Sequence, residues 1–283
     1  MLALKQTQAL RRELAASRCI PYTAHLSPHV IKTRFGDYLQ IIKLSGASFE
    51  TADDEQLNTW HERLNVLWRN IAGPNVALWV HLIRRREKAR FQESQGHGFA
   101  EALTCKYERR LSGERLMVNE IYLTLVYRPA AGLATGLAAK LLSRTQWDGG
   151  RAERKDALDA CEKLAQTLQA SLARYEPELL GVYDKEGRAY SRPLEFLSAL
   201  INGEEREVPL PRAPLNEVLA TTRLFFGTEA IEYRMPTETR VSAMLGIKEY
   251  PTPTIVGMYD RLLSAPFPFV LTQSFTFLTK VTG

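Results

Sequence analysis

Apolar residues recur at intervals of three and four in several stretches of the sequence, which is the pattern of amphipathic helices. The clearest such stretch covers residues 53–72. Asp53 is placed to cap this helix, Gln56 to complete the capping box, and Gly73 and Pro74 to end it. Similar stripes predict further helices over 97–111, 156–175, 193–203 and 253–263.

Shorter apolar or alternating stretches predict β-strands. The strand at 76–83 is apolar on both faces, so we expect it to be central in its sheet. Residues 38–83 give the order strand, helix, strand after a hairpin partner, and 230–278 give the same order. We therefore predict an α+β fold with mixed or antiparallel sheets and helices packed on one face, and we hypothesise a ββαβ unit in each of two subdomains. The strands are expected at 30–34, 38–44, 76–83, 116–127, 179–184, 223–226, 230–234, 240–248 and 269–277.

A change of composition divides the chain. Residues 129–150 are rich in Ala, Gly and small polar residues, unlike the patterned segments on either side. We therefore expect an N-terminal arm at 1–19, a first α+β subdomain at 20–147 and a second at 148–283, with the boundary near Trp147.

Composition and charge exclude few classes of protein. Apolar residues make up 45% and charged residues 24%, as in an average globular protein. The 37 Lys and Arg against 32 Asp and Glu give a net charge of +5, which permits an anionic partner without requiring one. Cys19, Cys105 and Cys161 are far apart and odd in number, which fits the reducing cytoplasm. We see neither a signal peptide nor a run of the ~20 apolar residues needed to cross a bilayer, so we expect a soluble or peripheral protein.

Catalytic and cofactor motifs are scarce. No G-x-x-x-x-G-K-[ST] sequence occurs, and the glycine-containing segment 132–140 has the wrong spacing for a phosphate-binding loop. His25 and His29 have H-x-x-x-H spacing, but Pro28 disfavours the helix that a metal site of this kind needs. We therefore predict a polar loop at 25–29 and no catalytic residue, cofactor or metal in this chain.

The basic run Arg84, Arg85 and Arg86 follows the predicted buried strand. It could contact nucleic acid, acidic lipid or an acidic partner surface. The alternative, which we favour, is a solvated strand end that discourages aggregation, because no aromatic residues interleave to stack single-stranded bases. Trp147 lies in the composition break, where a Trp can mark a docking surface. These four residues are the candidate partner contacts.

Short motifs spread in order over 20–277 resemble the N-terminal domain of the CagE/TrbE/VirB family of type IV secretion and conjugal transfer ATPases. Each match is short, and their common order makes the resemblance specific. Arg192 departs from the family pattern, which has an acidic residue at that point. The matching segments are Ile20-Pro21-Tyr22, His29-Val30, Ser48-Phe49-Glu50, Trp60-His61, 122–126 with Arg128-Pro129, Ser191 with 193–197, Phe225-Phe226-Gly227, Ile231-Glu232 and 250–277.

The resemblance implies a function in docking and assembly. Such a domain binds inner-membrane subunits of the secretion machine, helps to assemble a homo-oligomeric ring, and lies at the inner face of the bacterial inner membrane through its partners. ATP and Mg²⁺ are expected only in a C-terminal P-loop domain that this chain lacks, so we expect no enzymatic activity from the chain alone. The alternative is a nucleic-acid-binding module of a DNA transfer apparatus.

Overall fold

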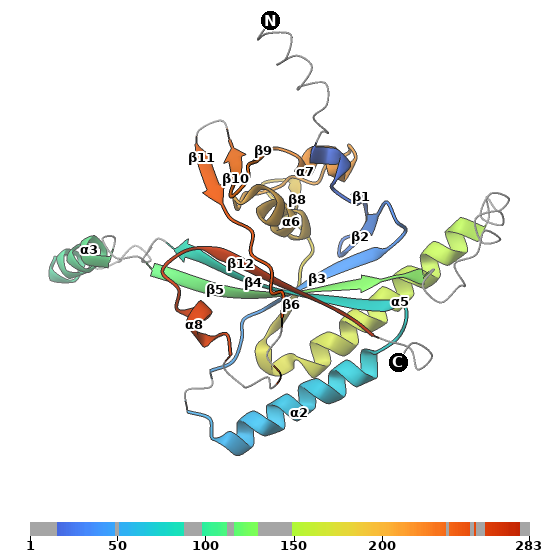
Figure 1. Ribbon diagram of the computed structural model, residues 1–283, viewed down its shortest axis with the longest axis horizontal. Coiled ribbons are helices and arrows are strands. Elements are labelled where there is room, and N and C mark those ends of the chain that lie inside the picture. Colours follow the sequence, from blue (N-terminus) through green and yellow to red (C-terminus); the bar gives the residue numbers. More distant parts are fainter. Residues whose placement is uncertain are drawn as a thin grey trace, which may run out of the picture.

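The computed structural model describes residues 16–48, 51–87, 98–111, 116–129, 149–235, 238–249, 252 and 258–277. Within them the chain forms a seven-stranded sheet, a three-stranded sheet and a two-stranded sheet. Every strand pairing described is antiparallel. Helices complete the structure, which confirms the predicted α+β class (Figure 1).

The large sheet has the order β1-β2-β3-β5-β4-β12, and β6 also pairs with β3. The predicted central position of β4 is confirmed, because it lies between β5 and β12. Its strands are β1 (Tyr22–Ser27), β2 (Val30–Thr33), β3 (Tyr38–Leu44), β4 (Val76–Glu87), β5 (Leu116–Tyr127), β6 (Pro177–Leu179) and β12 (Phe269–Thr276).

Helices cover both faces of the large sheet, which corrects the expectation of one covered face. In Figure 1, α2 (Asp54–Ile71) and α5 (Gly149–Ser171) lie below the sheet, and α6 (Arg192–Asn202) and α7 (Leu215–Leu219) lie above it. The reason is that the central strands are apolar on both sides. On β3, Ile41 packs into the core below α6, whereas the next residue, Ile42, packs into the core above α2 and α5.

The proposed second ββαβ unit does not form, because its strands belong to different sheets. Strands β9 (Arg223–Phe226), β10 (Ile231–Arg234) and β11 (Thr239–Ser242) make the three-stranded sheet, whereas β12 joins β4 in the large one. Within the described part of the predicted helix 253–263, only α8 (Asp260–Leu263) is helical. The boundary near Trp147 lies outside the described residues and stays a prediction, although β6 and β12 join strands from the first half of the chain.

Local capping interactions fix the start of α2 and both ends of α6. The carboxylate of Asp53 accepts a hydrogen bond from the backbone N–H of Gln56 at 2.8 Å, as a cap should. Ser191 caps α6 by accepting from the N–H of Leu194 at 3.3 Å, and Gly203 ends that helix at a φ of 70°.

The three-stranded sheet is attached to the end of α6. Arg240 of β11 donates a hydrogen bond from Nη1 to the carbonyl oxygen of Gly203 at 2.6 Å. Tyr233 of β10 lies against the same glycine. The two-stranded sheet, β7 (Val182–Lys185) and β8 (Arg188–Ser191), leads directly into α6.

The remaining elements lie at the periphery. Helix α3 (Phe99–Leu111) lies beyond the ends of β4 and β5, away from the other helices (Figure 1). The 3₁₀ turns η1 (Ala16–Arg18) and η3 (Ala173–Tyr175) complete the described elements. Among the residues described, no helix combines the length and apolar character needed to cross a membrane.

Candidate docking surface

The structure does not bring the three guanidinium groups of the basic run together. Successive side chains of a strand point to opposite faces, so Arg85 lies on the α6 side of the sheet and Arg84 on the other. Arg84 is only 8% exposed, and donates hydrogen bonds to the carbonyl oxygen of Ala265 at 2.6 Å and to Oδ1 of Asn119 at 2.8 Å. Of the three arginines, Arg86 alone is exposed.

Arg85 belongs to a charged network across the three central strands, β3, β5 and β4. Its Nε lies 3.2 Å from Oε2 of Glu120 and 3.0 Å from Oε1 of Glu205. Lys43 approaches Oε1 of Glu120 at 2.7 Å, so one carboxylate joins cations from both neighbouring strands. The Glu120 side chain is 9% exposed, which makes this an internal network that ties the strands together.

Protonation in this network follows from burial and from the paired charges. Burial alone would raise the pKa of Glu120, but the hydrogen bonds and charges of Arg85 and Lys43 outweigh it and lower the pKa overall. Burial, followed by the charge of Glu120, raises the pKa of Tyr122 to about 12. Glu120 is therefore ionised and Tyr122 neutral at physiological pH.

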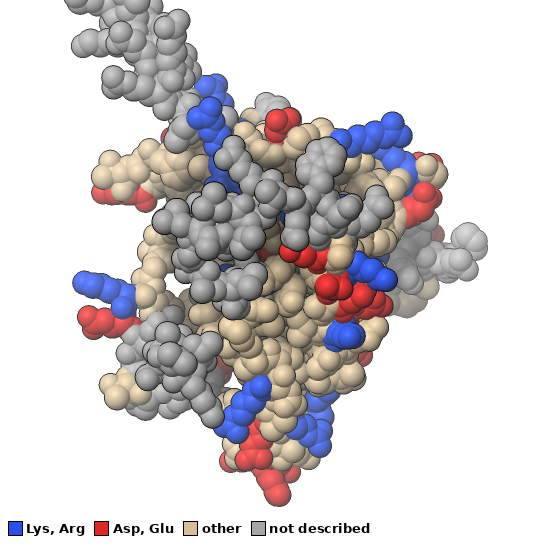
Figure 2. All heavy atoms as spheres, turned by 90° about the vertical axis from the view of Figure 1, so that its right-hand side faces the viewer, with Lys and Arg blue, Asp and Glu red and all other residues tan. Residues whose placement is uncertain are grey.

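A hollow of about 420 Å³ lies beside the network, between the sheet and α6. Its lining mixes both signs of charge, since Arg192 and Arg206 lie among Glu178, Glu195 and Glu207. Figure 2 likewise shows basic and acidic side chains interspersed over the coloured part of one face. This mixture gives neither hollow nor face a strong preference for a polyanion.

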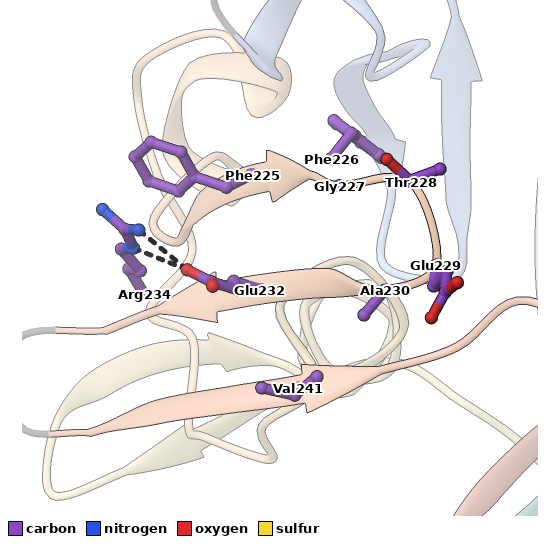
Figure 3. Close-up of a pocket in the computed structure, with 9 residues that line it drawn as sticks. All are labelled: Phe225, Phe226, Gly227, Thr228, Glu229, Ala230, Glu232, Arg234 and Val241. Atoms are coloured by element: carbon purple, nitrogen blue, oxygen red, sulfur yellow. Dashed lines mark hydrogen bonds and ion pairs between the residues drawn. The ribbon is translucent and has the colours of Figure 1, made fainter.

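A second hollow, of about 610 Å³, lies on the three-stranded sheet (Figure 3). Phe225, Glu232 and Val241 occupy opposite positions on β9, β10 and β11, so their side chains share the face that lines it. The guanidinium carbon of Arg234 lies 3.8 Å from the centre of the Phe225 ring, and Arg234 also pairs with Glu232 at 2.8 Å. An aromatic ring beside an arginine is typical of protein–protein interfaces.

Exposed apolar side chains continue from this hollow along the chain. Phe226 and Val241, which line the hollow, are 75% and 68% exposed. The segment 243–249 after β11 is exposed throughout. We call four residues at and after β11 the docking strip: Val241, Met244 (82% exposed), Leu245 (93%) and Ile247 (48%).

The docking strip is unusual, because four large apolar side chains within seven residues of sequence are exposed, and such side chains are more often buried. Strand β11 is also an edge of its sheet among the described residues, so its backbone groups can pair with an added strand. The sequence predicted one strand over 240–248, whereas β11 ends at Ser242 and 243–249 form an exposed segment, so this site was not anticipated. The run Met244-Leu245-Gly246-Ile247 looks identical in the sequence whether it is buried or exposed.

Two protein-family models match the sequence of this chain. The sequence model of the N-terminal domain of the type IV secretion system ATPase VirB4/TrbE matches residues 29–134. The model of the CagE, TrbE, VirB family, a component of the type IV transporter system, matches residues 178–282. The chain belongs to the CagE/TrbE/VirB family. The resemblance inferred from the sequence motifs is thereby confirmed.

Relatives within the family match along almost the whole chain. Type IV secretion system protein virB4 of Bartonella quintana is 37% identical over 96% of this chain and 35% of its own length. The virB4 protein of Brucella suis is 35% identical over 99% of the chain and 34% of its own length. PtlC of Bordetella pertussis is 35% identical over 95% of the chain and 33% of its own length. The chain thus spans about a third of the length of these curated relatives.

The two histidines with H-x-x-x-H spacing, His25 and His29, have separate hydrogen-bond partners. His25 lies on β1 and forms a hydrogen bond through Nε2 with Oγ of Ser191, the α6 cap, at 2.7 Å. His29 lies in the following turn and bonds through Nδ1 with the carbonyl oxygen of Leu180 at 3.0 Å. Both histidines therefore tie the first hairpin to the segment that starts α6. The described residues hold no group of three His, Cys, Asp or Glu placed to bind a metal.

His81 of β4 makes stability depend on pH. The side chain is 6% exposed, and Nδ1 forms a hydrogen bond with Oγ1 of Thr272 on β12 at 3.0 Å. Burial lowers the pKa of His81 from 6.5 to about 4. In the unfolded chain His81 becomes protonated below pH 6.5, whereas in the folded protein it stays neutral until about pH 4. Protonation therefore favours the unfolded state, and stability is lost as the pH falls from 6.5 to about 4.

Because of His81, we expect the free energy of unfolding to fall by about 2 kcal/mol when the pH is lowered from roughly 7 to 5. Urea unfolding at both pH values would measure it, and His81→Gln should show a correspondingly smaller loss. His61→Gln is the matched control, because His61 is exposed on α2. Equal losses in the wild-type protein and His81→Gln would contradict the assignment.

Proposed function

We propose that this chain is the docking and assembly domain of a type IV secretion ATPase. It binds inner-membrane subunits of the secretion machine and further copies of itself, and so positions the ATPase that powers substrate transfer or pilus assembly. The observation that carries the proposal is the docking strip, a run of exposed apolar side chains on and directly after the edge strand β11.

The chemistry of the strip suits an extended protein segment. A strand added to β11 would take its free backbone hydrogen bonds, as in β-strand addition. Val241 and Leu245 would then lose water contact against apolar side chains of the partner, and the aromatic ring and arginine of the neighbouring hollow would form a polar rim.

In this proposal the chain contributes position and partner choice, whereas nucleotide hydrolysis belongs to the rest of the ATPase. The domain lies at the inner face of the inner membrane. Purified alone, it should not turn over ATP with Mg²⁺. ATP hydrolysis at a rate that scales with the purity of the chain would contradict the proposal that hydrolysis belongs to the rest of the ATPase.

The docking test uses the double variant Val241→Asp/Leu245→Asp. Charges in a desolvated apolar contact are costly, so we expect binding to the inner-membrane subunits to weaken about tenfold or more. Size-exclusion chromatography with light scattering shows whether a complex forms, and surface-immobilised subunits give the dissociation constant.

Phe35→Asp is the matched control, because Phe35 is 68% exposed but lies in the turn between β2 and β3. It should bind as the wild-type chain does. Unchanged binding by the double variant, with its circular dichroism spectrum intact, would refute the docking strip. Equal weakening by both variants would point to a nonspecific effect of charge and also count against it.

The nucleic-acid alternative rested on the basic run. Arg84 and Arg85 are engaged in contacts within the protein, which leaves fewer cations for phosphates than the sequence indicated. Binding of a single-stranded oligonucleotide with a steep salt dependence, lost in Arg86→Ala, would nevertheless favour this alternative over docking.

A further inference from the structure

Helix α3 exposes several large apolar side chains. None of its residues is buried. Phe99 is 82% exposed, Leu103 54% and Tyr107 55%. In Figure 1 the helix lies past the ends of β4 and β5, outside the layers that bury α2, α5 and α6. Such a face is normally covered in the working protein, because apolar area exposed on a helix favours burial.

The charges around the helix indicate what covers it. At about 100° per residue, Phe99, Leu103, Tyr107 and Leu111 fall within an arc of about 120°. Lys106 and Arg110 fall within or beside the same arc. Glu101 and Glu108 fall on the opposite side of the helix.

The surrounding sequence has the same sign of charge. The stretch 84–111, from the end of β4 through α3, contains eight basic and four acidic residues. Its surplus of four positive charges compares with +5 for the whole chain. Arg84 and Arg85 are engaged in contacts within the large sheet, so the cations that lie beside the apolar arc are those of the helix itself, Lys106 and Arg110.

We propose that α3 binds directly to an anionic lipid bilayer and lies in the plane of the headgroups. Its apolar arc would enter the edge of the acyl region, while Lys106 and Arg110 extend toward phosphate groups and the glutamates face water. A helix of 13 residues is about 20 Å long and cannot span a hydrocarbon core of about 30 Å.

A lipid surface fits these observations better than a second copy of the helix. Two such arcs packed together would bring the cations beside each arc against each other, and like charges repel. An anionic bilayer instead supplies both the apolar phase and the opposite charge. The proposal goes beyond docking to protein subunits, because it uses a different surface and needs no partner protein.

The test is co-sedimentation of the 283-residue chain with vesicles, one set of phosphatidylcholine alone and one mixed with phosphatidylglycerol. We expect binding to the anionic vesicles, weaker binding to the neutral ones, and a decrease with salt. Phe99→Asp/Leu103→Asp should bind the anionic vesicles about tenfold or more weakly. Phe35→Asp, an exposed aromatic residue outside α3, should bind as the wild-type chain does.

A second measurement reports the orientation of the helix. Cys105 is exposed and lies opposite the apolar arc, whereas Ala100 lies within it. A polarity-sensitive dye is attached to Cys105 in a Cys19→Ser chain, or to the new thiol of Ala100→Cys in a Cys19→Ser/Cys105→Ser chain. With anionic vesicles, the dye at position 100 should shift to the blue and the dye at Cys105 should not.

Three outcomes would overturn the proposal. The first is no binding to anionic vesicles. The second is binding that the α3 substitutions leave unchanged. The third is a change of oligomeric state on α3 substitution without vesicles, which would show that a second copy covers the helix. The α3 variant should still bind the inner-membrane subunits, so failure here is distinguishable from failure of the docking proposal.

Discussion

Phe196→Ala should lower the free energy of unfolding by about 3–5 kcal/mol, which is the largest effect we predict. Phe196 lies on α6 and is 5% exposed. Its ring is 4.5 Å from that of Tyr122 and 5.3 Å from that of His81, measured between ring centres. Truncation would leave a cavity between α6 and the large sheet that the rigid strands cannot close.

The matched control is Phe226→Ala, the same substitution at a side chain that is 75% exposed. It should change stability by no more than about 0.5 kcal/mol. Urea unfolding followed by circular dichroism measures both variants. Similar losses in the two would mean that α6 is not held as the structure shows. Because α6 also carries the three-stranded sheet through Gly203, destabilising it should weaken partner docking as well.

Glu120→Ala should cost about 3 kcal/mol, because it leaves two cations without their shared carboxylate. Lys43 and Arg85 both pair with Glu120, whose side chain is 9% exposed. Each cation is about one-third exposed, so water compensates part of the loss and the cost stays at the lower end for buried pairs.

The control removes a carboxylate from an exposed pair. Glu178 pairs with Arg192, and the two side chains are 48% and 50% exposed, so Glu178→Ala should cost less than about 1 kcal/mol. The lowered pKa of Glu120 adds a test by pH: its stabilisation is present above the unfolded value of 4.5 and disappears as the pH falls through the folded value. The wild-type protein and Glu120→Ala should therefore approach each other in stability in acid. A constant difference would contradict the ion pairs.

Local features were predictable from the sequence where a few neighbouring residues decide them. Asp53 caps α2 through the backbone N–H of Gln56 as the sequence indicated, because a cap needs only a side chain and a backbone N–H three residues away. The apolar periodicity predicted α2 and most of the strands, because it too depends only on residues that are close in sequence. The family was also recognisable, since its short motifs keep their order along the chain.

Pairings between distant segments were beyond such reasoning. Strand β12 belongs beside β4 and not beside β11, although β11 is much closer in sequence. The basic run looked like a solvated strand end, yet the alternation of β4 turns Arg84 toward Ala265 and Arg85 toward Glu120 and Glu205. Ala265, Glu120 and Glu205 each lie at least 35 residues away from the arginine that they contact, so no local sequence pattern predicts these contacts.

The sequence by itself determined the cap of α2, the α+β class and the family of this protein, because capping and periodicity act within a few residues. Only the tertiary structure decided which apolar segments are core and which are surface. Leu197 of α6 and Leu245 of the docking strip are the same residue type, yet they are 1% and 93% exposed. The difference lies in what the fold places against each side chain, and burial free energy depends on that contact and not on the residue alone.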